Sequence, residues 1–516
     1  MKPAPTRKPF SHRQVFNQPG VLSVRNLFEG IRNLFRRSPA AGVPAATPGT
    51  WPLDQEMVRL TPHDCLTARD LFEGVLALGS PGSGKTSTSA TIILRAALHA
   101  GWSVVAFGAK PDDAPWFEQI CRRAGRTHQL RVIRPDGLTH FNLCRYELSR
   151  PGGGNSLTLA DLLTEVAREG KAPALPTEGS EFFESSSKML LCHCLDAFQL
   201  AGQPVSLDAI RQFLVSAPED SDTINDDSWE DSYCRQVLVR AAGRAPASGQ
   251  SDLADKVGRF FLQTWPRYDS RTRGNILATL EGALFELSRD PVRTLIDSPH
   301  GCSFVPEMIE QGAVYFVDCP SCVHGSAGRR LTIAFKRIFK DMLRRRTPDG
   351  DRARPVLVYS DEAQLYVTRD DADFQQTCRS GRVAVFMATQ SIDNFNAVLG
   401  SEAHTNSLAN ALTTNLVHCC VGRTAEWVQE RIAQQWREMQ SFSVPGAGDP
   451  SAHRTGLNIS EGLYPQVLAS ELARLKTGGS HNDRVVSLIA FKPGRVFRAS
   501  GRPFVHVQFR QPEEGV

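Results

Sequence analysis

A glycine-rich segment near the start of the chain has the residues needed to bind a nucleoside phosphate. Residues 79–86 read Gly-Ser-Pro-Gly-Ser-Gly-Lys-Thr and match the phosphate-loop pattern G-x-x-x-x-G-K-[ST]. The glycines let the backbone curl so that its N–H groups point at phosphate oxygens. Lys85 would neutralise the β- and γ-phosphates, and the Thr86 hydroxyl would bind Mg²⁺. The nucleotide-binding residues predicted from this pattern are Gly79, Pro81, Gly82, Ser83, Gly84, Lys85, Thr86 and Ser87.

The residues on both sides of this segment predict the context that a phosphate-binding loop needs. Residues 74–78 form a short apolar run that predicts a strand, and residues 87–100 show the apolar periodicity of a helix. A helix that begins at the loop directs the positive end of its dipole toward bound phosphate. This order favours a nucleotide-binding loop over a glycine-rich turn that matches the pattern by chance.

Two adjacent carboxylates stand at the end of another apolar strand. Residues 356–362 begin with an apolar run and end in Asp361 and Glu362. A carboxylate at the end of a buried strand can hold Mg²⁺ through water, and that role suits Asp361. Glu362 is placed to polarise an attacking water, so the pair indicates hydrolysis. The alternative is a strand that simply ends in a polar turn.

A third strand is predicted over residues 383–388, and polar residues lie at both of its ends. Gln390 follows the strand and could sense the γ-phosphate or orient water. Arg382 precedes it, and its guanidinium could reach the nucleotide of a neighbouring subunit and stabilise transition-state charge. Arg379 is a second candidate for this role. Alternatively, these arginines cap a helix or pair with surface acids.

Together, these motifs resemble a known family. The Asp361-Glu362 strand end, the Gly381-Arg382 pair and the strand tip at residues 388–391, in this order, are similar to the type IV secretion coupling proteins. These are TraG/TraD-like conjugative DNA pumps of the HerA/FtsK branch of P-loop ATPases. The resemblance runs from about residue 70 to about residue 436. Further similar segments are residues 110–111, 141–143, 275–280 and 313–318.

The resemblance implies a fold, an activity and partners. The fold is α/β, a RecA-like P-loop NTPase core with a mainly parallel sheet and an inserted all-helical domain. The activity is that of a hexameric ring that uses ATP and Mg²⁺ to move DNA through its pore. The implied partners are a relaxase, a nuclease or secretion-channel proteins. The implied roles are nucleotide contact at Lys85 and Thr86, Mg²⁺ and water handling at Asp361 and Glu362, sensing at Gln390, and a trans arginine at Arg382.

Composition agrees with a cytoplasmic machine of several domains. The chain has 516 residues and a net charge of +4, which does not by itself indicate nucleic-acid binding. No apolar run reaches the roughly 18 residues of a membrane span, although coupling proteins usually begin with membrane helices. The 12 cysteines include one C-x-x-C, at residues 319–322, so we expect reduced thiols and no structural zinc.

The strongest local charge lies on a predicted helix between residues 329 and 346. Apolar residues recur there at helical spacing, so one face should pack on the sheet while the other is basic. This basic face could bind DNA or could be a solvated helix face. Its members are Arg329, Arg330, Lys336, Arg337, Lys340, Arg344, Arg345 and Arg346.

The distance between motifs predicts the domain organisation. Lys85 and Asp361 are 276 positions apart, more than a bare P-loop core needs, and residues 157–270 show helical patterns with few strand-like runs. We expect a helix over residues 425–438, a loop over residues 442–462, and a β-pair at 485–491 and 504–509. The expected division is 1–50 basic tail, amphipathic helix and linker; 51–156 and 271–440 ATPase core; 157–270 helical insert; 441–516 loop and β-pair.

The N-terminal region has a short basic amphipathic pattern over residues 21–37, followed by a linker rich in Ala, Pro and Gly. Such a helix could pack on its own domain, dock into a partner, or lie on the inner membrane surface. For the whole chain, two functions stay open. One is an ATP-driven DNA translocase, and the other is an ATP-dependent scaffold or assembly ATPase in a secretion or defence complex.

Overall fold

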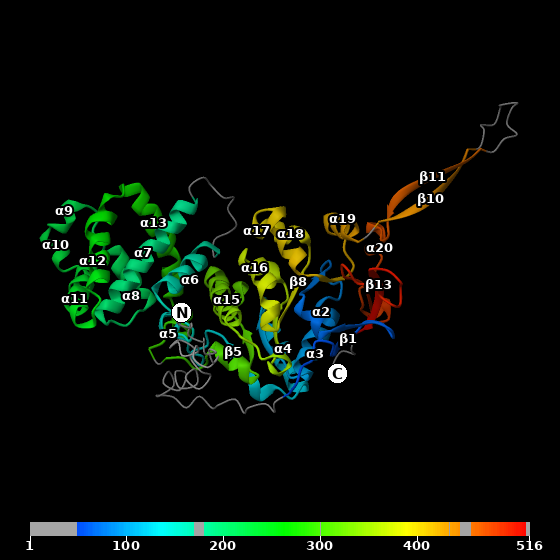
Figure 1. The fold of residues 1–516 in the computed structure, drawn as a ribbon, viewed down its shortest axis with the longest axis horizontal. Coiled ribbons are helices and arrows are strands. Elements are labelled where there is room, and N and C mark those ends of the chain that lie inside the picture. Colours follow the sequence, from blue (N-terminus) through cyan, green and yellow to red (C-terminus); the bar gives the residue numbers. More distant parts are fainter. Residues whose placement is uncertain (1–48, 170–179, 300, 433, 444–455, 512–516) are drawn as a thin grey trace, which may run out of the picture. The chain divides into compact units, whose positions relative to one another are not determined.

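Nine strands form the central sheet of the described residues, which in this computed structural model are 49–169, 180–299, 301–432, 434–443 and 456–511. Their order is β13-β12-β9-β3-β8-β7-β4-β6-β5, and the two edge strands β13 and β5 lie far apart in Figure 1. The strands from β9 to β5 are parallel, and β12 and β13 add an antiparallel pair beside β9. The bounds are β3 Val75–Leu78, β4 Ser103–Phe107, β5 Leu130–Ile133, β6 Val314–Val317, β7 Val356–Ser360, β8 Val383–Thr389, β9 Thr414–Val417, β12 Val485–Phe491 and β13 Phe504–Arg510. The predicted α/β fold with a mainly parallel sheet is therefore confirmed.

Helices cover both faces of this sheet, so its central strands are buried along their whole length and consist mainly of apolar residues. Every residue of β3, β7 and β8 is buried, as parallel strands require when both faces are packed. Phe316 of β6 contacts Phe117 of α4, and the preceding Tyr315 contacts Phe339 of α15 on the opposite face. Helices flanking the sheet are α2 Ala68–Phe72, α3 Thr91–His99, α4 Asp113–Arg123, α15 Ser321–Arg344, α16 Asp370–Cys378, α17 Ile392–Leu399, α18 Glu402–Ala411 and α19 Gly422–Arg431.

The strand order brings the chemical motifs to one edge. In the sheet β3 lies between β9 and β8, and β7 is the next neighbour of β8. Because these strands are parallel, their carboxyl ends meet at the same edge of the sheet. The phosphate loop follows β3, Asp361 follows β7 and Gln390 follows β8. Residues far apart along the chain therefore become neighbours, such as Thr86 and Asp361, which are 275 positions apart.

Between β5 and β6 the described residues contain helices but no named strand. This helical segment packs its own aromatic core, in which Phe213 contacts both Phe198 and Phe261. It continues through α13 and α14, beyond the boundary expected at residue 270. Its helices are α5 Leu143–Ser149, α6 Ser156–Glu169, α7 Ser180–Ala201, α8 Leu207–Val215, α9 Ser221–Ile224, α10 Asp227–Glu230, α11 Tyr233–Ser248, α12 Ser251–Arg259, α13 Ser270–Leu287 and α14 Val292–Ile296.

The structure corrects the expectation for residues 425–462. Helix α19 ends at Arg431, and the chain then forms β10 Gln434–Ser443, which pairs in antiparallel register with β11 Gly456–Pro465. The expected helix was too long, and part of the expected loop is strand. Val428, Ile432 and Trp436 recur every four residues and imitate a helix. The true partner of β10 lies about 20 residues further on, and a short window does not include it. Figure 1 shows the hairpin extending away from α19 and α20 Ala469–Leu472.

Two short strands, β1 Glu56–Arg59 and β2 Cys65–Thr67, form a separate antiparallel pair. The expected amphipathic helix at residues 21–37 lies outside the described residues. Among the helices that the structure does describe, none combines the length and the apolar character that crossing a membrane would require.

Candidate nucleotide site

The phosphate loop has the backbone that its glycines allow. Gly82 and Gly84 have φ values of 71° and 89°, in the left-handed region that other residues rarely adopt. Gly84 also contacts the C-terminal strands, since a Cβ there would lie 2.7 Å from Val486 Cγ2. Pro81 and Gly82 are exposed at the tip of the loop, whereas Ser83 is buried against Gly79. The loop therefore presents its backbone, more than its serine side chain, to a ligand.

Lys85 lies within the loop that precedes it. Its Nζ donates to the carbonyl oxygens of Gly79 and Ser80, at 2.5 and 3.2 Å. Burial lowers the pKa of Lys85, and the nearby carboxylates of Glu362 and Asp361 act in the opposite direction. The ammonium group is thus held where phosphate oxygens would approach the loop.

Thr86 and Asp361 meet directly. The Thr86 hydroxyl donates to Asp361 Oδ2 at 2.6 Å, although the residues come from different strands. Burial raises the pKa of Asp361, and the Thr86 hydrogen bond opposes that change. A hydroxyl and a carboxylate are hard oxygen donors, the kind that Mg²⁺ prefers. The two side chains therefore fit the chemistry of a Mg²⁺ site.

Glu362 is held by neutral amides. Gln390 Nε2 lies 2.9 and 3.0 Å from its two carboxylate oxygens, and Gln364 Nε2 donates to Oε2 at 2.7 Å. Lys110 Nζ lies 3.4 Å from Oε1. Burial acts to raise the pKa of Glu362, but these partners outweigh it and leave the pKa below its usual value. The carboxylate is therefore ionised at neutral pH, as a proton acceptor must be.

The backbone at Glu362 is also unusual. Its φ of 49° places a non-glycine residue in the left-handed region, directly after β7. Such conformations carry a cost of roughly 1–3 kcal/mol, and they cluster at functional sites. The turn directs the side chain toward Gln390 at the end of the neighbouring strand.

Sequence reasoning missed three residues around this site. Gln364 and Lys110 contact Glu362, and His418 lies beneath the loop, where its Nε2 is 2.6 Å from Ser89 Oγ. Burial lowers the pKa of His418 to about 3, so the ring is neutral. The sequence did contain a signal for Lys110 and His418, because both are polar residues that come shortly after a strand. Lys110 follows β4, which lies beside β7, and His418 follows β9, which lies beside β3.

The structure does not bring Arg382 to this site. Arg382 precedes β8, whereas Gln390 follows it, so the seven-residue strand separates them by roughly 20 Å. Its guanidinium is buried, donates to Asp351 at 2.8 Å and to the Trp51 carbonyl, and lies over Phe72. In this conformation the side chain is engaged within its own chain, and the expected trans role of Arg382 stays a prediction.

Arg379 differs from Arg382 in this respect. Its side chain is 55% exposed and pairs with Glu73 at 3.1 Å. Exposed ion pairs of this kind contribute little stability and exchange readily. Of the two arginines considered, Arg379 is the one accessible to another molecule.

The basic cluster on α15 is an internal ion-pair network. Lys336 and Lys340 are both 2% exposed and both pair with Asp371 of α16. Arg344 pairs with Asp370, and Arg337 with Glu165 of α6. Although burial acts to raise it, the pKa of Asp371 stays at about 2 because of the two lysines. These four side chains are therefore paired within the chain, and they form neither the DNA-binding face nor the solvated face that was expected.

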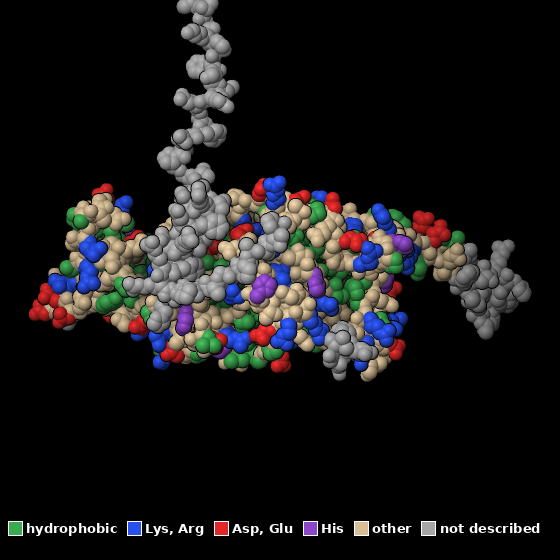
Figure 2. Space-filling model, turned by 90° about the horizontal axis from the view of Figure 1, so that it is seen from below, with side chains coloured by type: hydrophobic (Ala, Val, Ile, Leu, Met, Phe, Trp, Pro, Cys, Tyr) green, Lys and Arg blue, Asp and Glu red, His purple; other side chains and the backbone are tan. Residues whose placement is uncertain are grey.

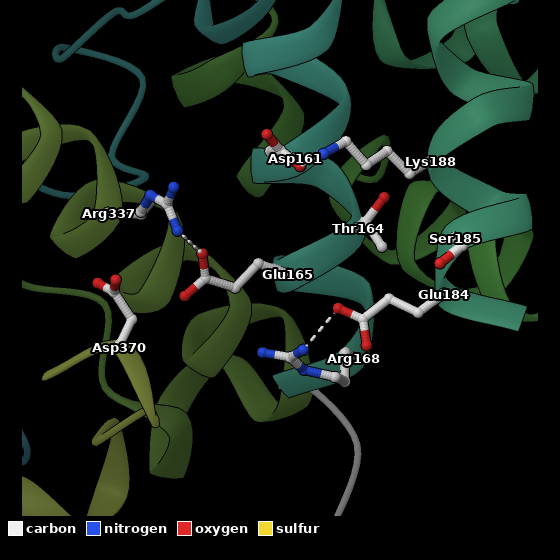
Figure 3. A pocket seen from close by; sticks show the side chains of 9 residues that line it. All are labelled: Asp161, Thr164, Glu165, Arg168, Glu184, Ser185, Lys188, Arg337 and Asp370. Carbon is white, nitrogen blue, oxygen red and sulfur yellow. Dashed lines mark hydrogen bonds and ion pairs between the residues drawn. The ribbon is translucent and has the colours of Figure 1, made fainter. Parts of the chain in front are cut away.

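Figure 3 shows the outer part of this network, where Arg337 reaches Glu165 and Arg168 reaches Glu184 across a polar pocket between α6, α7 and α15. The helix predicted to be basic in fact joins the helical segment to the core. On the face of the molecule in Figure 2, cationic and acidic side chains are interspersed rather than gathered in a stripe of one sign.

Comparisons with known proteins bear on the fold. A scan of protein-family models matches none, and a search of curated proteins finds no significant match. Solved structures do match. The unbound form of the bacterial conjugative coupling protein TrwBdeltaN70 is 14% identical with a TM-score of 0.58, over 92% of this chain and 95% of that chain. The plasmid coupling protein TrwB in complex with ADP and Mg²⁺ is 15% identical with a TM-score of 0.58, over 92% and 96%. TrwB with the ATP analogue ADPNP is 14% identical with a TM-score of 0.56, over 92% and 96%. This chain therefore has the fold of the conjugative coupling protein structures.

Proposed function

We propose that this protein is an ATP-hydrolysing motor that moves DNA. One observation carries the ATPase proposal. The phosphate loop, Asp361, Glu362 and Gln390 come from three adjacent parallel strands and are joined by hydrogen bonds of 2.6–3.0 Å. Solved structures with this fold contain ADP with Mg²⁺ and ADPNP, which supports nucleotide binding here.

The arrangement assigns a role to each group. The loop N–H groups and Lys85 would hold the phosphates, and Thr86 and Asp361 would hold Mg²⁺, which would supply charge neutralisation when bound. Glu362 would accept the proton of the attacking water, since its carboxylate is kept ionised. Gln390 donates to Glu362 and would orient it while the nucleophile is placed.

The motor proposal rests on the resemblance to coupling proteins and on the shared fold. It includes a homo-hexameric ring, DNA as substrate, and a relaxase, nuclease or secretion channel as possible partner. We place the protein in the cytoplasm, with residues 21–37 as a possible contact to the inner membrane. With Arg382 buried, Arg379 becomes the candidate for contact with a neighbouring nucleotide.

A specific observation favours the alternative, an ATP-dependent scaffold or assembly ATPase. The cationic helix that could have contacted DNA is neutralised internally. In addition, the β10–β11 hairpin exposes Trp436 and Leu463 opposite each other, at 68% and 53% exposure. Apolar side chains presented on a two-stranded hairpin suit contact with a protein more than with phosphates.

Steady-state ATP hydrolysis with and without DNA decides between these functions. The motor predicts ATPase activity that rises on addition of DNA and is lost in Lys85→Ala. Lys85-dependent ATPase activity that is indifferent to DNA would favour the assembly ATPase. A wild-type protein that neither binds nor hydrolyses ATP would overturn both.

A further inference from the structure

The nucleotide site has a direction that follows from the sheet. Asp361 and Glu362 follow β7 and Gln390 follows β8, so the catalytic groups lie on one side of the phosphate loop. The terminal phosphate must face them if Glu362 activates water. The ribose and base must then extend toward the other side of β3, where β9, β12 and β13 lie.

Residues from the C-terminal strands contact the loop on that side. Strand β12 runs antiparallel to β9, so its first residues lie at the same edge as the loop. Val486 packs closely against Gly84 of the loop, because a Cβ added to that glycine would lie 2.7 Å from Val486 Cγ2. Gln511 extends the β13 ladder by one hydrogen bond, from its N–H to the Arg484 carbonyl at 2.8 Å. Its side chain thereby reaches Ser87, which lies in the π-helical turn Thr86–Ala90 between the loop and α3.

The Gln511 carboxamide is fixed at both of its ends. Its Nε2 donates to Ser87 Oγ at 2.6 Å, and its Oε1 accepts from the Gly479 N–H at 2.8 Å. Gly478, at a φ of 83°, has no room for a Cβ because the carboxamide occupies that space. A carboxamide nitrogen carries two hydrogens, so one remains to donate beyond Ser87.

We propose that Gln511 binds the ribose hydroxyls of the nucleotide. The proposal rests on the proposed ATP binding and adds the residue that recognises the sugar. Ser87, one position beyond Thr86, marks the end of the phosphate-binding segment. The side chain of Gln511 is hydrogen-bonded directly to the Ser87 hydroxyl. A rigid neutral donor suits a ribose hydroxyl, which both donates and accepts, and leaves the phosphates to the loop and Lys85.

The test is calorimetric titration of the full chain with ADP, 2′,3′-dideoxyADP and pyrophosphate in the presence of Mg²⁺. Wild-type protein should bind dideoxyADP about three- to tenfold more weakly than ADP, because one hydrogen bond is lost. Gln511→Met should bind ADP more weakly by a similar factor, should no longer distinguish the two nucleotides, and should bind pyrophosphate as the wild type does. Gln508→Met, on the exposed side of the same strand, is the matched control and should change none of these affinities.

Two results would overturn the proposal. One is a wild-type protein that binds ADP and dideoxyADP equally, a measurement that does not depend on whether any variant folds. The other is an equal loss of ADP and pyrophosphate binding in Gln511→Met, which would make Gln511 a support of the loop. Failure of the proposed function looks different, because then the wild type would show no Lys85-dependent binding of ADP at all.

Discussion

Two clusters of charge in this molecule have the same ingredients but opposite surroundings. At the candidate nucleotide site, the Glu362 carboxylate is held mainly by two neutral amides, with one lysine at 3.4 Å. Beneath α15, the Asp371 carboxylate is buried between two lysines. An amide orients a carboxylate and leaves its charge available, whereas a buried ammonium group neutralises it. Charge that is held but not neutralised marks the site where chemistry is possible.

The largest expected effect tests the available carboxylate. Glu362→Gln keeps the size of the side chain but cannot accept a proton, so ATP turnover should fall by about 10²–10⁴ while ATP binding persists. Single-turnover hydrolysis and equilibrium binding of ATP measure the two quantities. If Glu362→Gln turned over ATP at the wild-type rate, Glu362 would not be the base. The proposed difference between the two clusters would then have no support.

The neutralised carboxylate should instead affect folding. Asp371→Asn leaves Lys336 and Lys340 buried with less compensation and should lower the free energy of unfolding by about 3–5 kcal/mol. Asp373→Asn, on the exposed side of the same helix, is the control and should change it by less than about 0.5 kcal/mol. Denaturant unfolding measures both. If Asp371→Asn were as stable as the control, the ion-pair network would make no measurable contribution to the free energy of unfolding.

The pH dependence of stability sharpens the same point. The pKa of Asp371 is about 2 in the folded protein, below its value of roughly 3.9 in an unfolded chain. A depressed pKa contributes stability that is fully present above about pH 4 and is lost as pH falls toward 2. Unfolding curves between pH 5 and pH 2 should therefore show a steeper loss for the wild type than for Asp371→Asn.

The two arginines form a smaller version of the comparison. Arg382→Ala removes a buried guanidinium with several partners and should lower the free energy of unfolding by about 1–3 kcal/mol. Arg379→Ala should leave it within about 0.5 kcal/mol, because an exposed pair contributes little. Should Arg379 act in trans, a mixture of inactive Arg379→Ala and Lys85→Ala subunits would recover ATPase activity. A silent mixture of proven hetero-oligomers would exclude that role.

The smallest effect concerns how Glu362 is kept ionised. Gln364→Ala removes one donor that lowers the pKa of this carboxylate, so its pKa should rise. The acidic limb of the kcat profile should then move to higher pH, while the plateau changes little. An unshifted limb would assign the low pKa to Gln390 and the lysines.

The local chemistry of the site could be predicted from sequence, but its surroundings could not. The phosphate loop, Asp361, Glu362 and Gln390 each follow a short apolar strand, a pattern contained within about ten residues. Arg382 and the α15 lysines carry the same charges as functional residues. What decides their role is a partner far away in the chain, such as Trp51 for Arg382. Similarly, Gln511 reaches Ser87 only through the antiparallel pairing of the last strands.

The position of β3 in the sheet has a consequence for how the protein is made. Both neighbours of this strand, β8 and β9, come more than 300 residues later in the sequence. At the usual rate of roughly 5–20 residues per second, a ribosome needs on the order of 15–60 s to supply them. Throughout that interval the strand before the phosphate loop lacks both of its neighbours, whereas the helical segment can complete its aromatic core before β8 is made. A nascent chain should thus acquire nucleotide binding late and abruptly, and any product that stops before β9 should lack it entirely.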